Sequence, residues 1–178
     1  MGPRVLIAGI GNIFCGDDGF GPEVVRHLAS AGQPALPAGV TLVDYGIRGL
    51  HLAYDVLDGY DALVLVDALP GEGRPGELKV LEVGADDVPR PAPGAELDAH
   101  SMSPVAVLSS VSTLGGQLPP TYVVGALPAD LSEGIGLSEP MTAAVPRAAD
   151  TVRALLQERL DLDLGADDAH EMTPRRSE

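Results

Sequence analysis

Residues 5–28 read VLIAGIGNIFCGDDGFGPEVVRHL: an apolar run, a glycine-rich stretch with two adjacent aspartates, and an amphipathic segment. The uninterrupted apolar run ending in glycine is typical of a strand that is buried on both faces of a parallel sheet. Pro22 and Glu23 suit the first turn of a helix, and apolar residues follow them at helical spacing. This stretch therefore predicts a buried strand, a tight loop and a helix.

The rest of the chain repeats this alternation of strand and helix. A second strand is predicted at residues 40–46, and buried strands at residues 61–69 and 121–127. Helices are predicted at residues 50–57, 104–115 and 138–160, with Ser138 as the N-cap of the last helix. Residues 71–83 combine turn residues with an alternating pattern, which favours an antiparallel or edge strand. Such an order implies right-handed βαβ units, so we expect an α/β fold, a three-layer sandwich with helices on both faces of the sheet.

The length and composition of the chain indicate how many domains it forms. It has 178 residues, of which 45% are hydrophobic, which suits one folded domain with a sizeable core. We expect this single domain to span residues 1–160. Residues 161–178 are acidic and polar without periodicity, so a disordered tail is predicted there.

The charge and the cysteine count exclude several classes of function. A formal net charge of −15 repels phosphate backbones, which argues against binding to nucleic acid or to an anionic membrane. Cys15 is the single cysteine, so no disulfide can form within the chain and a reducing cytosol is the default compartment. No apolar run approaches the roughly 20 residues of a membrane span, and the start lacks the features of a signal peptide. We therefore expect a cytoplasmic protein.

One interpretation of the glycine-rich stretch is a phosphate-binding loop. The segment GIGNIF begins like the dinucleotide fingerprint G-x-G-x-x-G, but Phe14 stands at the third glycine position. Asp17 and Asp18 also place negative charge beside the helix N-terminus, where a phosphate would bind. A nucleotide-binding module remains an alternative, although both features count against it.

A second interpretation is a metal site. Asp17 or Asp18 follows the first strand, and Asp67 ends the third strand. In a doubly wound sheet of order 2-1-3 these two strands are neighbours, so both carboxylates point into one crevice. His100, in LDAHSMSP, supplies an imidazole just before a helix. Two carboxylates and one histidine suit a divalent ion such as nickel, zinc, iron or manganese.

The separation of these residues in the sequence leaves simpler roles open. An aspartate at the end of a strand often forms a turn or caps a helix, and a lone histidine in a loop usually lies at the surface. A serine or cysteine hydrolase is disfavoured. The chain has no G-x-S-x-G motif, and the carboxylates beside Cys15 disfavour a nucleophilic thiolate there.

Five segments together resemble the hydrogenase maturation proteases, the endopeptidases that trim the C-terminus of the large subunit of nickel–iron hydrogenases. These segments are AGIGNIFCGDDGFGPEVVRHL, VDYG, LVLVDAL, LDAHSMSP and VVGALPADLSEGIGLSEP. The resemblance covers about residues 4–158. It implies a twisted, mostly parallel five-stranded sheet between helices.

The resemblance also implies roles for individual residues. The three metal-binding positions of the family map onto Asp18, Asp67 and His100, which are therefore the expected metal ligands and catalytic residues. The metal would be nickel that arrives with the substrate, so no tightly bound resting metal is required. We expect Asp44 to shape the crevice, and Asp17 to cap the following turn or to face solvent.

The implied function is removal of the C-terminal peptide from a hydrogenase large-subunit precursor after nickel insertion. The precursor is then the partner of this protein, which is expected to be a monomer. The alternative is a non-catalytic metallochaperone or checkpoint protein that binds the nickel-loaded precursor. Both functions need the same three ligands, but only the protease releases a peptide.

Overall fold

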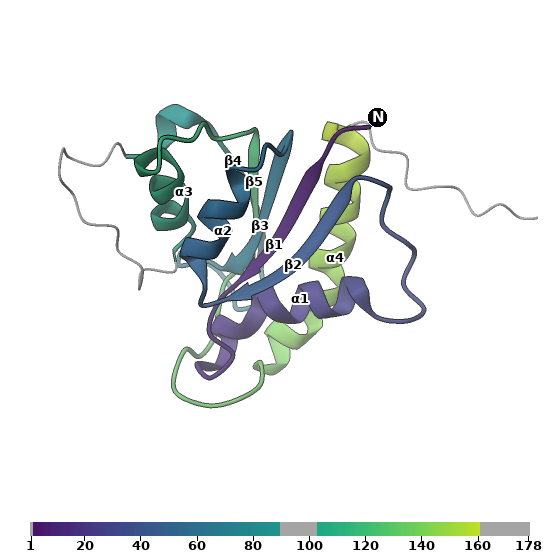
Figure 1. Ribbon diagram of the computed structural model, residues 1–178. Coiled ribbons are helices and arrows are strands. Elements are labelled where there is room, and N and C mark those ends of the chain that lie inside the picture. The colour runs from purple at the N-terminus through teal and green to yellow at the C-terminus, as the bar shows by residue number, and fades with distance from the viewer. Residues whose placement is uncertain (1, 90–102, 161–178) are drawn as a thin grey trace, which may run out of the picture.

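The computed structural model describes residues 2–89 and 103–160, and its centre is one five-stranded sheet (Figure 1). The strands are β1 (Val5–Ile10), β2 (Val40–Gly46), β3 (Ala62–Ala68), β4 (Leu78–Val83) and β5 (Thr121–Ala126). Their order is β2-β1-β3-β5-β4, and all neighbours pair in parallel except β4, which is antiparallel to β5. The predicted 2-1-3 order and the antiparallel edge strand are confirmed.

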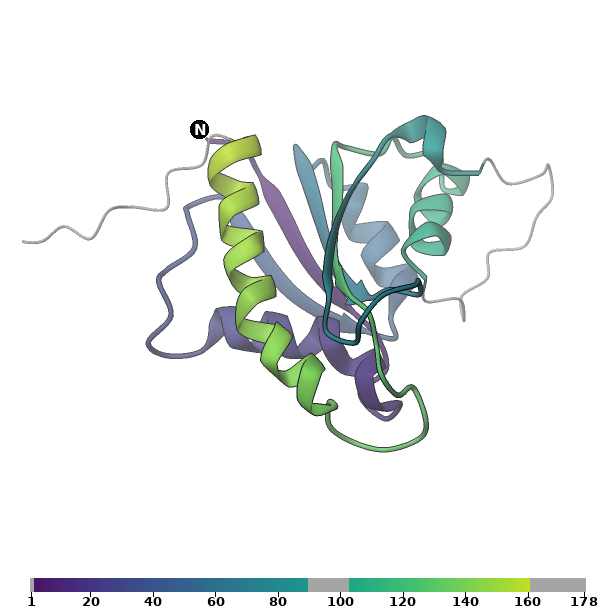
Figure 2. The same cartoon turned by 180° about the vertical axis from the view of Figure 1, so that it is seen from behind.

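The helices form the two outer layers. They are α1 (Phe20–Ala29), α2 (Gly49–Val56), α3 (Pro104–Thr113) and α4 (Glu139–Leu160), with short 3-10 helices η1 (Gly16–Gly19) and η2 (Ala85–Asp87). Helices α1 and α4 pack together on one face of the sheet, and α2 and α3 pack together on the other (Figure 1, Figure 2). The predicted three-layer α/β sandwich is therefore confirmed.

The sheet divides the hydrophobic core into two halves. All six residues of β1 are buried, and alternate side chains enter opposite halves. Val5 and Ile7 belong to the half that contains α1 and α4, whereas Leu6 and Ala8 belong to the half that contains α2 and α3. A strand that is covered on both faces must be apolar throughout, which explains the uninterrupted apolar run.

Two glycines bring α1 directly onto the strands. A Cβ atom on Gly21 would overlap the carbonyl oxygens of Val66 and Ile10, and one on Gly9 would overlap the carbonyl oxygen of Gly21. Only residues without a side chain allow this approach. The start of α1 therefore lies at the carboxyl ends of β1 and β3, close to Asp67.

Two predictions concern residues that the structure does not describe. The acidic tail at residues 161–178 and the histidine at position 100 both lie outside the described ranges. Within residues 2–89 and 103–160, no helix combines the length and apolarity that crossing a membrane would require.

Candidate functional site

The loop between β1 and α1 folds back across the carboxyl end of the sheet. Gly11 starts this loop with a φ of 135°, and a Cβ atom on it would overlap the carbonyl oxygen of Asp18. The amide of Asn12 donates to Oδ2 of Asp18 at 2.7 Å, and the amide of Asp18 donates to the carbonyl of Cys15 at 3.1 Å. The glycine and these two hydrogen bonds hold the Asp18 carboxylate at the end of β1.

Asp67 lies beside this loop at the end of β3, the strand next to β1. Its side chain is only 4% exposed, and its Oδ1 atom accepts a hydrogen bond from the amide of Ala68 at 2.8 Å. The same Oδ1 atom is 3.7 Å from the place where a Cβ atom of Gly11 would lie. The structure therefore brings Asp67 under the loop that carries Asp18, as the strand order predicted.

The environment of Asp67 favours its neutral form. Burial and then the negative charge of Asp18 raise the pKa of Asp67 to about 8, although the hydrogen bond from Ala68 acts in the opposite direction. Asp67 is therefore mostly protonated at neutral pH. The ion pairs found among residues 2–89 and 103–160 join Arg26 to Glu23 and Arg159 to Glu82, so neither compensates this pair of carboxylates. A cation that entered here would replace the proton and relieve the repulsion.

The third predicted ligand, His100, lies outside the described residues, so its role stays a prediction. In the part of the chain that the structure describes, no group of three His, Cys, Asp or Glu side chains could hold a metal ion. A three-ligand metal site that contains Asp18 and Asp67 therefore needs at least one further donor. That donor would come from another part of the chain or from a bound partner.

Asp17 does not face solvent or cap the following turn, so the prediction for this residue was wrong. Its side chain is 0% exposed and points toward the loop between β5 and α4. Its carboxylate accepts hydrogen bonds from the amides of Ala129 (2.8 Å), Asp130 (2.9 Å) and Ser138 (2.6 Å), and from the Ser138 hydroxyl (2.9 Å). Asp17 thus ties the two loops together.

These hydrogen bonds keep Asp17 ionised. Burial alone would raise the pKa of Asp17, but the hydrogen bonds from Ser138, Asp130 and Ala129 outweigh it, and the pKa lies below its usual value. Ser138 directly precedes α4, at the position where it was predicted to be the N-cap. Its hydroxyl donates a hydrogen bond to the carboxylate of Asp17. The two adjacent aspartates therefore have opposite surroundings: Asp17 serves the loop structure, and Asp18 lies in the crevice.

Backbone hydrogen bonds extend this connection between the loops. The amide of Asp17 donates to the carbonyl of Asp130 at 2.9 Å. The amide of Gly16 donates to the carbonyl of Gly134, and the amide of Gly134 donates to the carbonyl of Phe14, both at 2.9 Å. Sequence reasoning missed this connection because Asp17 is separated from its partners by 112 to 121 residues. No periodicity or local motif links positions so far apart.

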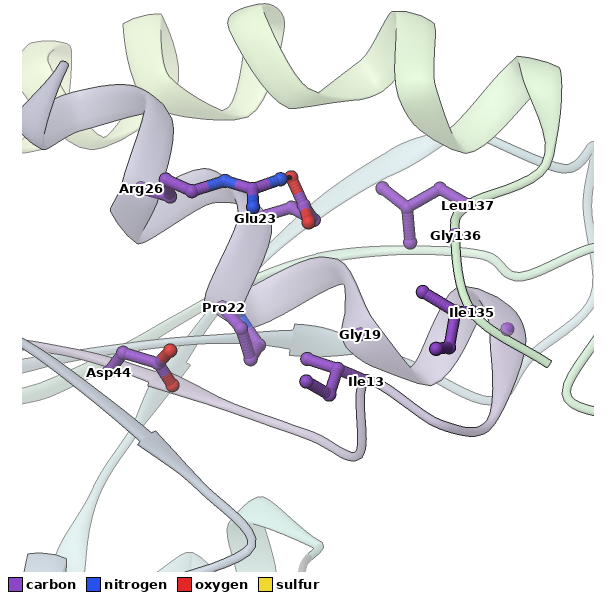
Figure 3. Close-up of a pocket in the computed structure, with 10 residues that line it drawn as sticks. Ile13, Gly19, Pro22, Glu23, Arg26, Asp44, Ile135, Gly136 and Leu137 are labelled. Atoms are coloured by element: carbon purple, nitrogen blue, oxygen red, sulfur yellow. Dashed lines mark hydrogen bonds and ion pairs between the residues drawn. The ribbon is translucent and has the colours of Figure 1, made fainter. Parts of the chain in front are cut away.

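Two pockets flank the β1–α1 loop. The first, of about 360 Å³, lies between this loop, α1 and the β5–α4 loop (Figure 3). The second, of about 290 Å³, lies between the β1–α1 loop and residues 44–48. Asp44 lines both pockets, and its Oδ1 atom accepts a hydrogen bond from the amide of Gly46 at 2.9 Å. This position agrees with the expectation that Asp44 shapes the crevice.

Sequence comparisons place the chain among proteins of hydrogenase maturation. A family model described as hydrogenase maturation protease matches residues 22–155. The hydrogenase expression/formation protein HupD of Rhizobium leguminosarum bv. viciae is 33% identical over 156 residues, which cover 87% of this chain and 75% of the relative. The hydrogenase 2 maturation protease of Escherichia coli is 29% identical over 156 residues, which cover 87% of this chain and 92% of the relative.

Solved structures share the fold. The crystal structure of a hydrogenase 2 maturation peptidase from a Thaumarchaeota archaeon is 32% identical, with a TM-score of 0.65 over 86% of this chain and 98% of that chain. The hydrogenase maturating endopeptidase HybD of Escherichia coli is 26% identical, with a TM-score of 0.67 over 87% of this chain and 93% of that chain. From the family match and these relatives, we conclude that the chain belongs to the hydrogenase maturation protease family.

Proposed function

We propose that this protein is an endopeptidase that removes the C-terminal peptide of a nickel–iron hydrogenase large-subunit precursor after nickel has been inserted. The observation that carries the proposal is the meeting of Asp18 and Asp67 at the carboxyl ends of β1 and β3, in a chain of this family. Ligands of parallel α/β sheets bind at this edge. The two side chains come from neighbouring strands and are uncompensated by the ion pairs described above.

The nickel in this proposal belongs to the substrate. Asp18, Asp67 and His100 together supply two oxygen donors and one nitrogen donor, a set that suits nickel among the borderline divalent ions. Asp67 holds a proton at neutral pH because its pKa is raised to about 8, and the arrival of a cation would release that proton. Recognition of the metal would then make cleavage conditional on completed nickel insertion.

The same carboxylates have a chemical role in this proposal. The substrate's nickel supplies a positive charge that polarises the scissile carbonyl or a bound water molecule. Asp18 or Asp67, once ionised, accepts the proton of the attacking water as a general base. The burial of Asp67 and the loop above it limit the access of bulk water to this proton transfer.

The test compares two forms of the precursor, with and without nickel, incubated with the parent protein and analysed by intact mass. We expect loss of a C-terminal peptide from the nickel-loaded form only. Asp18→Ala, Asp67→Ala and His100→Ala should slow trimming by at least about 100-fold, the usual size of a lost general base or ligand. Asp150→Ala, which changes an exposed aspartate on α4, is the matched control and should trim at the parent rate.

The other outcomes separate the competing functions. Trimming at the parent rate by both Asp18→Ala and Asp67→Ala would reject the proposed site. Equal trimming of both precursor forms would keep the protease and remove the nickel-sensing role. Binding of the nickel-loaded precursor without any trimming would favour the checkpoint protein.

A further inference from the structure

The two pockets are lined by residues of the loop that carries Asp18. Gly16 and Gly19, on either side of Asp18, line the first pocket. Gly11 and Asn12, which hold Asp18 in place, line the second. A polypeptide that presents a scissile bond to Asp18 and Asp67 must therefore lie next to both pockets.

Apolar side chains are held in solvent around these pockets. Five of the ten large hydrophobic side chains that are exposed in the described residues lie on the three loops at this edge of the sheet. These five are Ile13, Phe14, Ile47, Leu131 and Ile135. Ile135 is 81% exposed and Ile47 is 59% exposed. A gathering of exposed apolar residues at one edge marks a surface that contacts another molecule.

The backbone around these side chains is fixed before any partner arrives. Asp17 binds the β5–α4 loop through Ala129, Asp130 and Ser138, and Gly134 is bonded to both Gly16 and Phe14. These bonds hold the β1–α1 and β5–α4 loops with Ile13 and Ile135 exposed. The loop of Ile47 is bonded to the β1–α1 loop through the Gly11 amide and the carbonyl of Gly46, at 3.0 Å. A surface that is ordered in advance loses less conformational entropy when it binds.

The two pockets lie on either side of one loop and offer an extended peptide two places for its side chains. Ile13 and Asp44 line both pockets and so lie between them. In Figure 3, Ile135 and Leu137 lie across the first pocket from Asp44. Side chains i and i+2 of an extended chain point to the same side, about 7 Å apart, so two of them can enter pockets on either side of one loop.

The charges beside the first pocket restrict the kind of peptide. Glu23 and Arg26 form an ion pair with each other, which leaves the carboxylate of Asp44 at the rim. Asp44 and the net charge of −15 repel acidic side chains. The first pocket therefore fits an apolar side chain from a segment that is neutral or basic. Arg48 lines the second pocket, and its guanidinium donates to the backbone carbonyls of Asp44 and Tyr45.

We propose that two apolar side chains of the precursor segment at the scissile bond occupy these pockets, one beside Ile135 and the other beside Ile47. This inference rests on the proposed function and adds to it the residues that bind the substrate peptide. Ile135 lines only the first pocket and Ile47 only the second, so each can be tested separately.

The experiment measures kcat and KM for trimming of the nickel-loaded precursor by Ile135→Ser and Ile47→Ser. Each change should raise KM by about tenfold, because each removes an aliphatic side chain from a contact that the bound peptide buries. The kcat and the Tm should stay at the parent values, because both side chains are exposed in the free protein. Ile135→Leu should keep the parent KM.

Leu81→Ser is the matched control, because Leu81 is 47% exposed on the edge strand β4 and lines neither pocket. Parent-like KM values in both isoleucine variants would overturn the inference, and so would a fall in kcat without a change in KM.

A second measurement separates this inference from the proposed function. The affinity of the parent and of both serine variants for the nickel-loaded precursor is measured directly, whether or not the parent trims it. Weaker binding by Ile135→Ser and Ile47→Ser supports the docking pockets even if no peptide is released. Equal binding by all three proteins overturns them.

Discussion

Asp17 and Asp18 are adjacent in the sequence, yet their carboxylates have opposite roles. Four hydrogen bonds surround the buried Asp17, whereas Asp18 accepts one from Asn12 and repels Asp67. The 3-10 helix η1 turns the two side chains in different directions. One residue therefore stabilises the loop that presents the other.

We predict that Asp17→Ala lowers the free energy of unfolding by about 3–5 kcal/mol, because it leaves three backbone amides and one hydroxyl without their acceptor. The pKa of Asp17 is lowered in the fold, so its contribution is present above the unfolded value of 3.8 and is lost as the pH falls below it. Urea unfolding at pH 7 and at pH 3 measures both effects. A loss below about 1 kcal/mol at pH 7 would contradict this role.

Asp67 has the opposite dependence on pH. Its pKa rises from 3.8 in the unfolded chain to about 8 in the fold, so unfolding releases a proton between these values and stability falls as the pH rises from about 4 to 8. Asp67→Asn keeps the acceptor for the Ala68 amide and removes this penalty. We predict that its Tm exceeds that of the parent by several degrees at pH 8, and that the difference shrinks toward pH 4.

Thermal unfolding of the parent and of Asp67→Asn between pH 4 and pH 8 checks this prediction. Asp44→Asn, which changes an exposed carboxylate at the same edge of the sheet, is the control and should follow the parent curve. If the Tm of the parent and the Tm of Asp67→Asn change with pH in parallel, burial and Asp18 do not hold a proton on Asp67.

At the scale of elements, the contact between α1 and the sheet positions the site. In dinucleotide-binding folds the last glycine of the fingerprint allows a helix to pack closely on a strand. Phe14 stands at that position here, but Gly21 provides the close approach from the first turn of α1. The loop is longer than in the fingerprint, and the added residues include Asp17 and Asp18.

We predict that Gly21→Ala destabilises the protein by about 1–3 kcal/mol or more, because its Cβ atom would overlap the backbone oxygens of Val66 and Ile10. Helix propensity alone predicts the opposite sign, since alanine favours a helix over glycine by about 1 kcal/mol. Chemical unfolding at pH 7 decides between these expectations. Gly2→Ala, which has open space around its Cβ position, is the control and should be neutral.

At the scale of the whole molecule, the parallel strands gather the candidate site at one edge. The loops that follow β1, β2 and β5 meet there, and they carry the two pockets and the exposed isoleucines. The two faces of the sheet are covered by helices. The chain carries a net charge of −15, which favours a partner that brings a cation or a neutral to basic peptide.

Much of the architecture followed from local sequence. A strand buried on both faces must be apolar, and parallel strands are joined by right-handed crossovers, so the order of elements predicted a parallel sheet. The doubly wound order 2-1-3 makes β1 and β3 neighbours in that sheet. The proximity of Asp18 and Asp67 is a consequence of that adjacency. The edge position of β4 was likewise visible in its alternating residues.

The surroundings of the site required the three-dimensional structure. The role of Asp17 depends on amides 112 to 121 residues away, and the raised pKa of Asp67 depends on its burial beneath the loop of Asp18. The pockets form between loops from separate parts of the chain. Periodicity and turn residues report the local conformation of a segment, whereas hydrogen bonds, desolvation and pocket shape depend on distances between segments that only folding brings together.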